Sequence, residues 1–237
     1  MASLLSRYKA GEHKQVWAEL LAMEEGVRDE PLLSEAYEVA HETMSRVRAN
    51  VELLVPRLQS VGYQFGIYPD GSYPVDYAGP QVPSSTDTSS TIAALEKMTG
   101  AIPLSLQVFW EVVGSVDLTG YHSEWPQYSD PLIVYPVDGI DAEYNDWKAD
   151  CEEYGLDEVG AFGILIAPDV YHKDNVSGGP PYSILVPNAR ADAPLVYEQN
   201  GTTFVDYLRI CFRCGGFPGR GPLPLDLPEL TRGLFPI

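Results

Sequence analysis

Residues 1–66 carry the clearest hydrophobic periodicity of the chain. Between residues 33 and 61, apolar side chains recur at alternating steps of four and three, a spacing that places them on one face of an α-helix. Gly62 is a natural stop for this helix, and Pro56, inside the pattern, predicts a kink or an earlier end. The stripe predicts a long helix packed on its own protein. Residues 6–25 predict a shorter helix that pairs with it.

The periodicity stops at residues 67–90. This segment contains four prolines, two glycines and seven serines or threonines, and it has no basic residue. Such a composition is typical of a linker or of an extended crossing over the surface. We therefore divide the chain into an N-terminal helical segment (1–66), this linker, and a C-terminal domain (91–237), although the two sides can still share a core.

Signals for helices and strands are mixed in residues 91–237. A helix capped by Ser89–Thr91 ends at Gly100, Ile102-Pro103-Leu104 opens a second helix, and a final one starts at Thr203. Strand-like runs lie between them, at Val116–Tyr121, Pro131–Tyr135, Phe162–Ala167, Tyr182–Val186 and Pro194–Tyr197. This order predicts an α+β fold, in which a mostly antiparallel sheet is backed by helices. The predicted fold also has an N-terminal helical extension and an irregular Pro/Gly-rich C-terminal tail that packs on the protein.

Composition narrows the classes of function. The 237 residues include 34 acids and 15 Lys or Arg, and the net charge of −19 disfavours binding to nucleic-acid backbones. No apolar run approaches the roughly 18 residues of a membrane span, and the N-terminus lacks the apolar stretch of a signal peptide. Three cysteines, an odd number, are typical of reduced thiols in the cytoplasm. We expect a cytoplasmic protein that binds neither nucleic acid nor membranes.

The excess negative charge is concentrated in residues 138–158. Nine acids and one base, Lys148, give this segment a net charge of −8. Such a field attracts a basic protein and speeds its association, and aromatic side chains in the segment would supply buried anchors. The residues that we assign to partner binding are Asp141, Glu143, Tyr144, Asp146, Trp147, Asp150, Glu152, Glu153, Asp157 and Glu158. The alternative is a solvated helix face or a loop that keeps the protein soluble.

Several features follow one another in a characteristic order between residues 92 and 213. They are Leu95-Glu96, Gly100 with Ile102-Pro103-Leu104, Phe109-Trp110 with Gly114, the acidic insertion around Trp147, and a closing helix with Thr203-Phe204-Val205-Asp206-Tyr207-Leu208. This order resembles the SUKH superfamily, which includes bacterial immunity proteins of polymorphic toxin systems and yeast regulators of cell-wall synthesis. In this chain Val113 replaces the usual Asn or Asp before the glycine, and residues 1–90 have no counterpart.

The resemblance implies a single antiparallel sheet backed by helices, no catalytic residues, and neutralisation of a toxin by direct binding. We therefore expect a non-enzymatic protein-binding module, most specifically an immunity protein for a basic toxin domain. An acidic surface suits this role because toxin domains that attack nucleic acid need basic surfaces. The resemblance leaves the partner's identity and the oligomeric state open.

Two other classes of function stay open. A metal-dependent hydrolase would use four side chains for metal binding or acid–base work: His122, Asp169, His172 and Asp174. No strict motif such as H-E-x-x-H accompanies them. A regulatory scaffold would dimerise through the face of residues 33–61. Neither the acidic segment nor the pair Cys211 and Cys214 has the ligand spacing of a calcium or zinc site, so we expect no metal and no cofactor.

Overall fold

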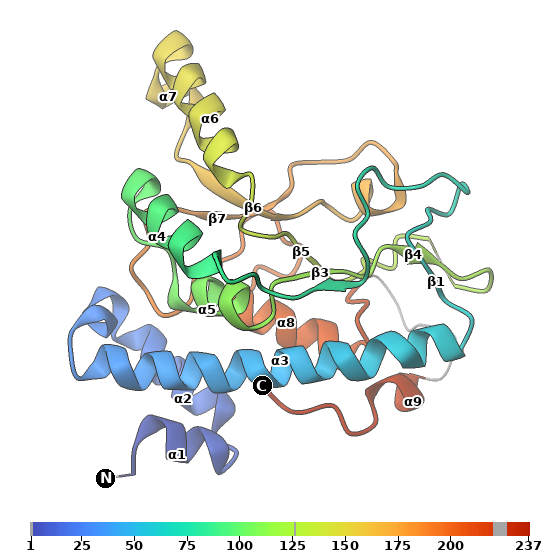
Figure 1. The fold of residues 1–237 in the computed structure, drawn as a ribbon, viewed down its shortest axis with the longest axis horizontal. Helices are drawn as coiled ribbons and strands as arrows, with labels where there is room; N and C mark the ends of the chain where they lie inside the picture. Colours follow the sequence, from blue (N-terminus) through green and yellow to red (C-terminus); the bar gives the residue numbers. More distant parts are fainter. Residues whose placement is uncertain (1, 126, 220–226) are drawn as a thin grey trace.

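The helix α3 (Leu32–Ser60) spans most of the long axis of the molecule (Figure 1). The computed structural model describes residues 2–125, 127–219 and 227–237. Of the two outcomes predicted at Pro56, a kink or an earlier end, the earlier end does not occur, because the helix continues through this residue. Leu54 and Leu58, on either side of the proline, are completely buried. Burial of their side chains outweighs the loss of the one hydrogen bond that proline cannot donate.

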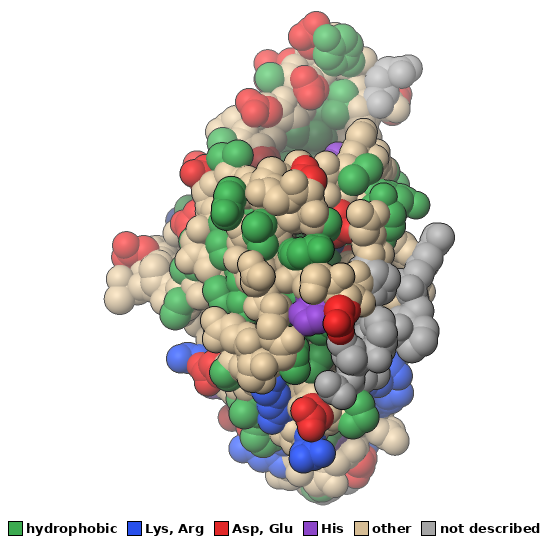
Figure 2. Space-filling view, turned by 90° about the vertical axis from the view of Figure 1, so that its right-hand side faces the viewer, with side chains coloured by type: hydrophobic (Ala, Val, Ile, Leu, Met, Phe, Trp, Pro, Cys, Tyr) green, Lys and Arg blue, Asp and Glu red, His purple; other side chains and the backbone are tan. Residues whose placement is uncertain are grey.

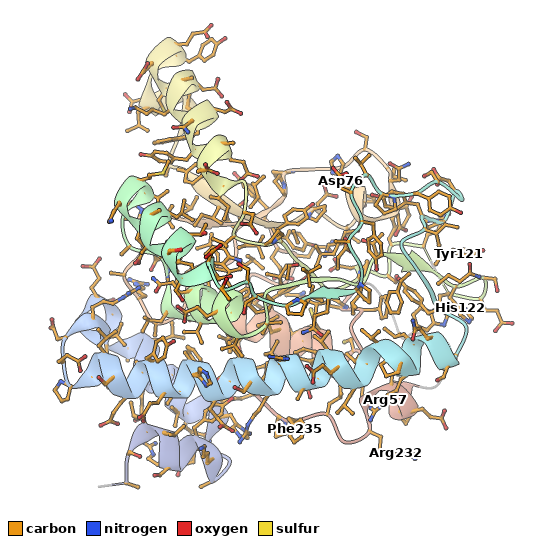
Figure 3. All side chains as sticks on the ribbon, viewed as in Figure 1. Arg57, Asp76, Tyr121, His122, Arg232 and Phe235 are labelled. Carbon is orange, nitrogen blue, oxygen red and sulfur yellow. The ribbon has the colours of Figure 1, made fainter. Side chains whose placement is uncertain are left out.

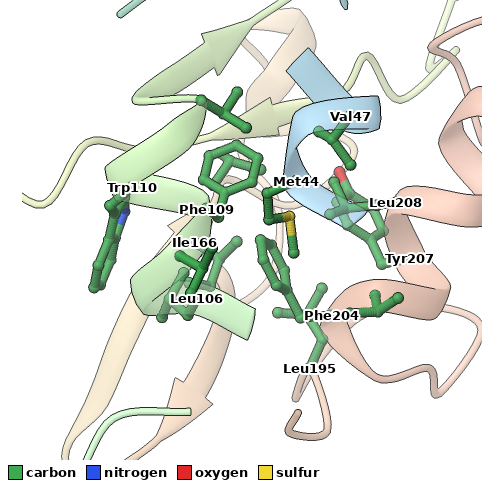
Figure 4. Packing of buried hydrophobic residues seen from close by; sticks show 14 of the residues in the cluster. Met44, Val47, Leu106, Phe109, Trp110, Ile166, Leu195, Phe204, Tyr207 and Leu208 are labelled. Carbon is green, nitrogen blue, oxygen red and sulfur yellow. The ribbon is translucent and has the colours of Figure 1, made fainter. Parts of the chain in front are cut away.

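One hydrophobic core joins residues from both ends of the chain. The completely buried hydrophobic side chains of α3 are Val39, Ala40, Met44, Val47, Val51, Leu54 and Leu58. They pack chiefly on α5 (Leu104–Val112), and α8 (Phe204–Arg213) borders the same core (Figure 4). The predicted stripe is thus an ordinary core face. A second copy of the chain cannot reach it without unfolding the protein, so the face proposed for dimerisation is not available.

Two short helices pack beneath α3 where a single helix over residues 6–25 is predicted. They are α1 (Leu4–Lys9) and α2 (His13–Ala22), and a 3-10 turn, η1 (Glu24–Arg28), follows them. The single-helix prediction is wrong because Gly11 adopts a φ of +106°, which no right-handed helix contains. The indole Nε1 of Trp17 donates to Thr43 Oγ1 over 3.1 Å, and this bond ties α2 to α3.

The strands form three short antiparallel sheets. Strand β1 (Gln64–Phe65) pairs with β4 (Gly120–Tyr121), β2 (Gln81–Val82) and β5 (Ile133–Val134) flank β3 (Ser115–Asp117), and β6 (Gly163–Ala167) pairs with β7 (Tyr182–Leu185). The Tyr135 N–H donates to Ile166 O over 2.9 Å, which links β5 to β6. Helices and antiparallel sheets confirm the α+β fold. The sheet is divided, however, and the predicted strand 194–197 forms only isolated bridges.

Helices cover the sheets on the side of α3. The helix α4 (Thr88–Thr99) ends at Gly100 as predicted, with a φ of +82°. A side chain at Gly100 would also collide with Pro187, so both backbone conformation and space require glycine there.

At the start of α8, the Thr203 side chain accepts a hydrogen bond from the Asp206 N–H. No helix among the described residues is long and apolar enough to cross a membrane.

Residues 67–90 cross the surface and are tied to it. Strand β2 within this segment pairs with β3. The Tyr77 hydroxyl donates to Asp117 O over 3.1 Å, and the Ser84 hydroxyl donates to Glu111 O over 2.8 Å. Because α3 and α5 pack directly on each other, this segment does not separate two cores.

The C-terminal tail lies along α3 in its described part. It contains the short helix α9 (Leu227–Thr231), and Asn50 of α3 forms two hydrogen bonds with the backbone of Phe235, of 2.9 and 2.7 Å. Arg57 donates to Leu230 O over 2.8 Å. Figure 3 shows Arg57 and Phe235 beside α3. These bonds support the expectation that the tail packs on the protein, while Leu223 and Leu225 lie outside the described residues.

We expect replacement of Leu54 by alanine to lower the free energy of unfolding by about 2–5 kcal/mol, because it leaves a cavity in the shared core. The matched control is Gln59→Ala, on the exposed side of the same helix, with a change within about 0.5 kcal/mol. Urea unfolding followed by circular dichroism measures both. Equal losses in the two variants would contradict the single-core description.

Candidate functional site

A helical arm projects from the body of the molecule (Figure 1). It consists of α6 (Ile140–Tyr154) and the one-turn helix α7 (Leu156–Val159). Glycines with positive φ precede α6, separate the two helices and follow α7, and such residues interrupt helices readily. Ile140 is the one buried residue among the described side chains of α6. We call residues 138–160 the acidic arm.

Two aromatic side chains of the acidic arm pack on Phe162, the residue directly before β6. The ring centroids of Tyr144 and Trp147 lie 5.1 and 5.6 Å from that of Phe162, and Trp147 Nε1 donates to Gly160 O over 3.1 Å. Both rings are half-buried against the core. The sequence analysis assigns them to partner binding, whereas in the structure their packing fixes the arm to its own protein.

Four carboxylates of α6 form a stripe on one exposed face. Glu143, Asp146, Asp150 and Glu153 are separated by steps of three and four residues, which places them within about 80° of one another around the helix axis. Of the other predicted partner-binding acids, Asp141 and Glu152 lie outside this stripe on α6, and Asp157 is exposed on α7. The side chain of Glu158 lies outside the described part of the structure.

The charges of this stripe are not neutralised within the protein. Among the described residues, no carboxylate of the acidic arm forms an ion pair. Like charges at steps of three or four each cost a few tenths of a kcal/mol in helix stability. Glu152 and Glu153 also lie at the C-terminal end of α6, where the helix dipole disfavours negative charge. The distribution of charge on the arm therefore lowers the stability of helix α6.

The tip of the arm exposes apolar surface that the sequence analysis missed. The side chains of Tyr154 and Leu156 are 61% and 57% exposed. Tyr154 follows the acidic stripe directly, and Glu153 raises the pKa of its hydroxyl by accepting a hydrogen bond from it. Gly155 in the sequence could have indicated this surface, because a helix that ends there leaves Tyr154 and Leu156 at its end, with no neighbouring element to cover them. The exposed surface thus combines carboxylates with an apolar end.

On the face that Figure 2 shows, the basic side chains lie away from the acidic arm. In Figure 2 the arm at the top shows carboxylates, and the Lys and Arg side chains visible on this face gather in its lower part. Ion pairs on the N-terminal helices join Arg7 to Glu12 and Glu19, Arg46 to Glu42, and Arg48 to Glu52. Several acids there are paired, whereas no carboxylate of the acidic arm has an ion pair among the described residues.

His122 is already used in local hydrogen bonds. Its Nε2 donates to Val61 O over 3.0 Å, and its Nδ1 accepts from the Glu124 N–H over 3.1 Å. Figure 3 shows this histidine at the end of the molecule where α3 stops. Because both ring nitrogens are engaged, neither has a lone pair left for a metal.

The predicted carboxylates of the hydrolase site are also engaged. His172 in η2 (His172–Asp174) is hydrogen-bonded through Nδ1 to Asp169 Oδ2, and the Tyr171 N–H donates to Asp169 Oδ1 over 2.8 Å. Asp174 Oδ2 accepts from the Tyr128 N–H over 2.6 Å. No group of three or more His, Cys, Asp or Glu side chains suited to a metal occurs in the described residues. The four predicted side chains therefore do not form a metal cluster within the described part of the chain.

A buried ion pair lies next to this loop. Lys173 and Asp130 are only 2% and 3% exposed, and the Lys173 ammonium is hydrogen-bonded to the Asp130 carboxylate. The ammonium also lies 4.8 Å from the ring centroid of Tyr182 and 5.9 Å from that of Tyr207. Nothing in the sequence pattern signals this pair, because tertiary folding brings together residues 43 positions apart.

The two cysteines of the C-x-x-C pair are free thiols near the end of α8. Burial raises the pKa of Cys211 well above its usual value and also raises the pKa of Cys214. A raised pKa disfavours the thiolate, which is the reactive form. Both thiols are therefore suited to packing rather than to redox chemistry.

Comparison with protein families and known proteins finds no protein similar to this chain. No family model matches the chain, and neither curated proteins nor solved structures give a match to it. The resemblance to the SUKH superfamily therefore stays a prediction from the order of elements, and function must be argued from the described surface.

We expect Lys173→Met to lower the free energy of unfolding by about 3–5 kcal/mol, because it leaves the Asp130 carboxylate buried without its partner. The double variant Lys173→Met/Asp130→Asn, which removes the stranded charge, should recover a large part of this loss. Lys97→Met, at an exposed lysine of α4, is the control with little effect. Thermal unfolding that ranks the double variant below Lys173→Met would contradict this account.

The contribution of the Asp169 carboxylate to stability can be tested by its dependence on pH. Burial alone would raise its pKa, but the bonds from His172 and from two backbone N–H groups outweigh burial and lower it. A lowered pKa contributes stability above the unfolded value of about 3.9, and this stability is lost as the pH falls through the folded value. We expect Asp169→Asn to cost about 1 kcal/mol at pH 7 and progressively less below pH about 4.

Urea unfolding at several pH values measures this difference. Asp157→Asn, at an exposed acid of the arm, serves as the control and should show a small effect at every pH. A cost of Asp169→Asn that stays constant into strong acid would show that the carboxylate contributes nothing through its charge.

Proposed function

We propose that this chain is a non-enzymatic protein-binding module that docks a basic partner protein on its acidic arm. The observation that carries the proposal is the unpaired carboxylate stripe on a projecting helix that ends in exposed Tyr154 and Leu156. The stripe has no ion pair among the described residues, and its charge opposes the stability of its own helix. A binding role explains why these residues occur together.

The two parts of the arm would contribute differently to a complex. Carboxylates on a protruding surface steer a positively charged protein during diffusion and raise the association rate more than the final affinity. Large apolar side chains at the tip lose water on contact and slow dissociation. Because Tyr144 and Trp147 pack on Phe162, the arm is held in position before the partner arrives, which reduces the entropy lost on binding.

The specific partner class that we propose is a basic toxin domain. The observed order from α4 and α5 through the strands, α6 and β6 to α8 is consistent with the element order on which the SUKH resemblance rests. That resemblance implies immunity by direct binding, and a nuclease-type toxin needs the cationic surface that the arm complements. The metal-dependent hydrolase has less support, because His122 and Asp169 are engaged in local bonds.

The test is association kinetics with the toxin domain encoded in the neighbouring reading frame. We expect Asp146→Lys/Asp150→Lys/Glu153→Lys to lower the association rate constant at 20 mM salt by at least about tenfold and to flatten its dependence on salt. The matched control, Glu25→Lys/Glu38→Lys/Glu124→Lys, changes the net charge equally at exposed acids outside the arm. It should change the rate less than about threefold.

Two outcomes would count against the proposal. An unchanged rate constant in the arm variant would exclude the acidic stripe as the docking surface. If the neighbouring frames encode no modular toxin with a basic domain, the immunity role is wrong, whatever the arm binds.

A further inference from the structure

A cavity of about 890 Å³ lies between α2, α8 and the C-terminal segment 231–237. This size falls in the range of sites for small organic molecules. The cavity belongs to neither the acidic arm nor the loop around Asp169. One part of its wall is apolar, formed by Ile210, Phe212, Leu234 and Ile237. An apolar wall of this extent favours a ligand with a hydrocarbon body.

The polar part of the wall is rich in donors. Among the described side chains that line it, three are cations, Lys14, Arg209 and Arg213, and one is an acid, Asp206. Arg209 Nη1 donates to Asp206 over 2.8 Å, so this carboxylate is already used. Lys14 and Arg213 form no hydrogen bond or ion pair with any described residue. The lining thus carries unneutralised positive charge in a chain whose net charge is −19.

His13 adds a neutral donor to the same wall. Arg46 Nη1 lies 2.7 Å from His13 Nε2, and because guanidinium only donates, Nε2 must accept and the ring proton resides on Nδ1. Burial, followed by the charges of Arg46 and Arg209, lowers the pKa of His13 and keeps the ring neutral near pH 7. Nδ1 has no acceptor among the described residues. The N-terminal end of α2, where His13 lies, adds a positive dipole.

We propose that this cavity binds an organic anion with an apolar body, such as an aliphatic carboxylate. The carboxylate accepts from Lys14, Arg213 and His13, and the hydrocarbon lies on Ile210 and Leu234. Two unpaired cations and one neutral donor are enough to hold a single carboxylate, whereas a polyphosphate would need more cations. The proposal does not depend on the protein-binding function of the acidic arm.

Sodium octanoate is the probe, added to the full chain and followed by isothermal titration calorimetry. We expect saturable one-to-one binding, with octan-1-ol at least about tenfold weaker because it lacks the charge-assisted hydrogen bonds. Acetate, which lacks the apolar body, should be weaker by a similar factor or more. In NMR spectra, the His13 imidazole signals should shift on addition of octanoate.

The variant Lys14→Gln/Arg213→Gln should weaken octanoate binding about tenfold or more. Its matched control is Lys97→Gln/Lys148→Gln, which removes two exposed lysines outside the cavity and should change the affinity less than about twofold. Absence of saturable octanoate binding would overturn the proposal. Equal weakening in both double variants, or equal affinity for octanoate and octan-1-ol, would do so as well.

Discussion

Burial of one face of α3 is the constraint on which the other elements depend. The side chains from Val39 to Leu58 on that face are excluded from water, and α5 and α8 pack on the core that they form. Because an apolar face of this length is costly to expose, the N-terminal helices, the central sheets and the described tail must fold around it. The buried side chains of the face considered for dimerisation in the sequence analysis are in this way inaccessible to a second copy of the chain.

The same constraint explains where the carboxylates lie. A core that joins both ends of the chain leaves no room for charges without partners, which are too costly to bury. The N-terminal helices neutralise several acids with arginines, such as Arg7 with Glu19. The insertion between β5 and β6 has a single base, Lys148, and projects as a helix in which the acids stay in water. The protein therefore separates an acidic arm from a body in which negative charge is less dense.

Polar groups in the interior stabilise the fold by bonding to one another. Lys173 and Asp130 pair between two tyrosine rings, and Asp169 orders its own loop by accepting bonds from His172 and Tyr171. Of these side chains, Asp169 and His172 belong to the hydrolase site that the sequence analysis considers. Since their donors and acceptors already satisfy one another, the exposed arm and the donor-rich cavity beside α2 are the surfaces left for external ligands.

Local patterns were enough to predict the α+β class, the stripe of α3, the stop at Gly100 and the start of α8 at Thr203, because each depends on side-chain periodicity or on capping within a few residues. They were also enough to locate the acidic segment. They could not show that Trp147 packs on Phe162, that Lys173 meets Asp130, or that Lys14 and Arg213 share one cavity. Those contacts join distant parts of the chain, and packing of the whole core sets their distances, so no local pattern contains them.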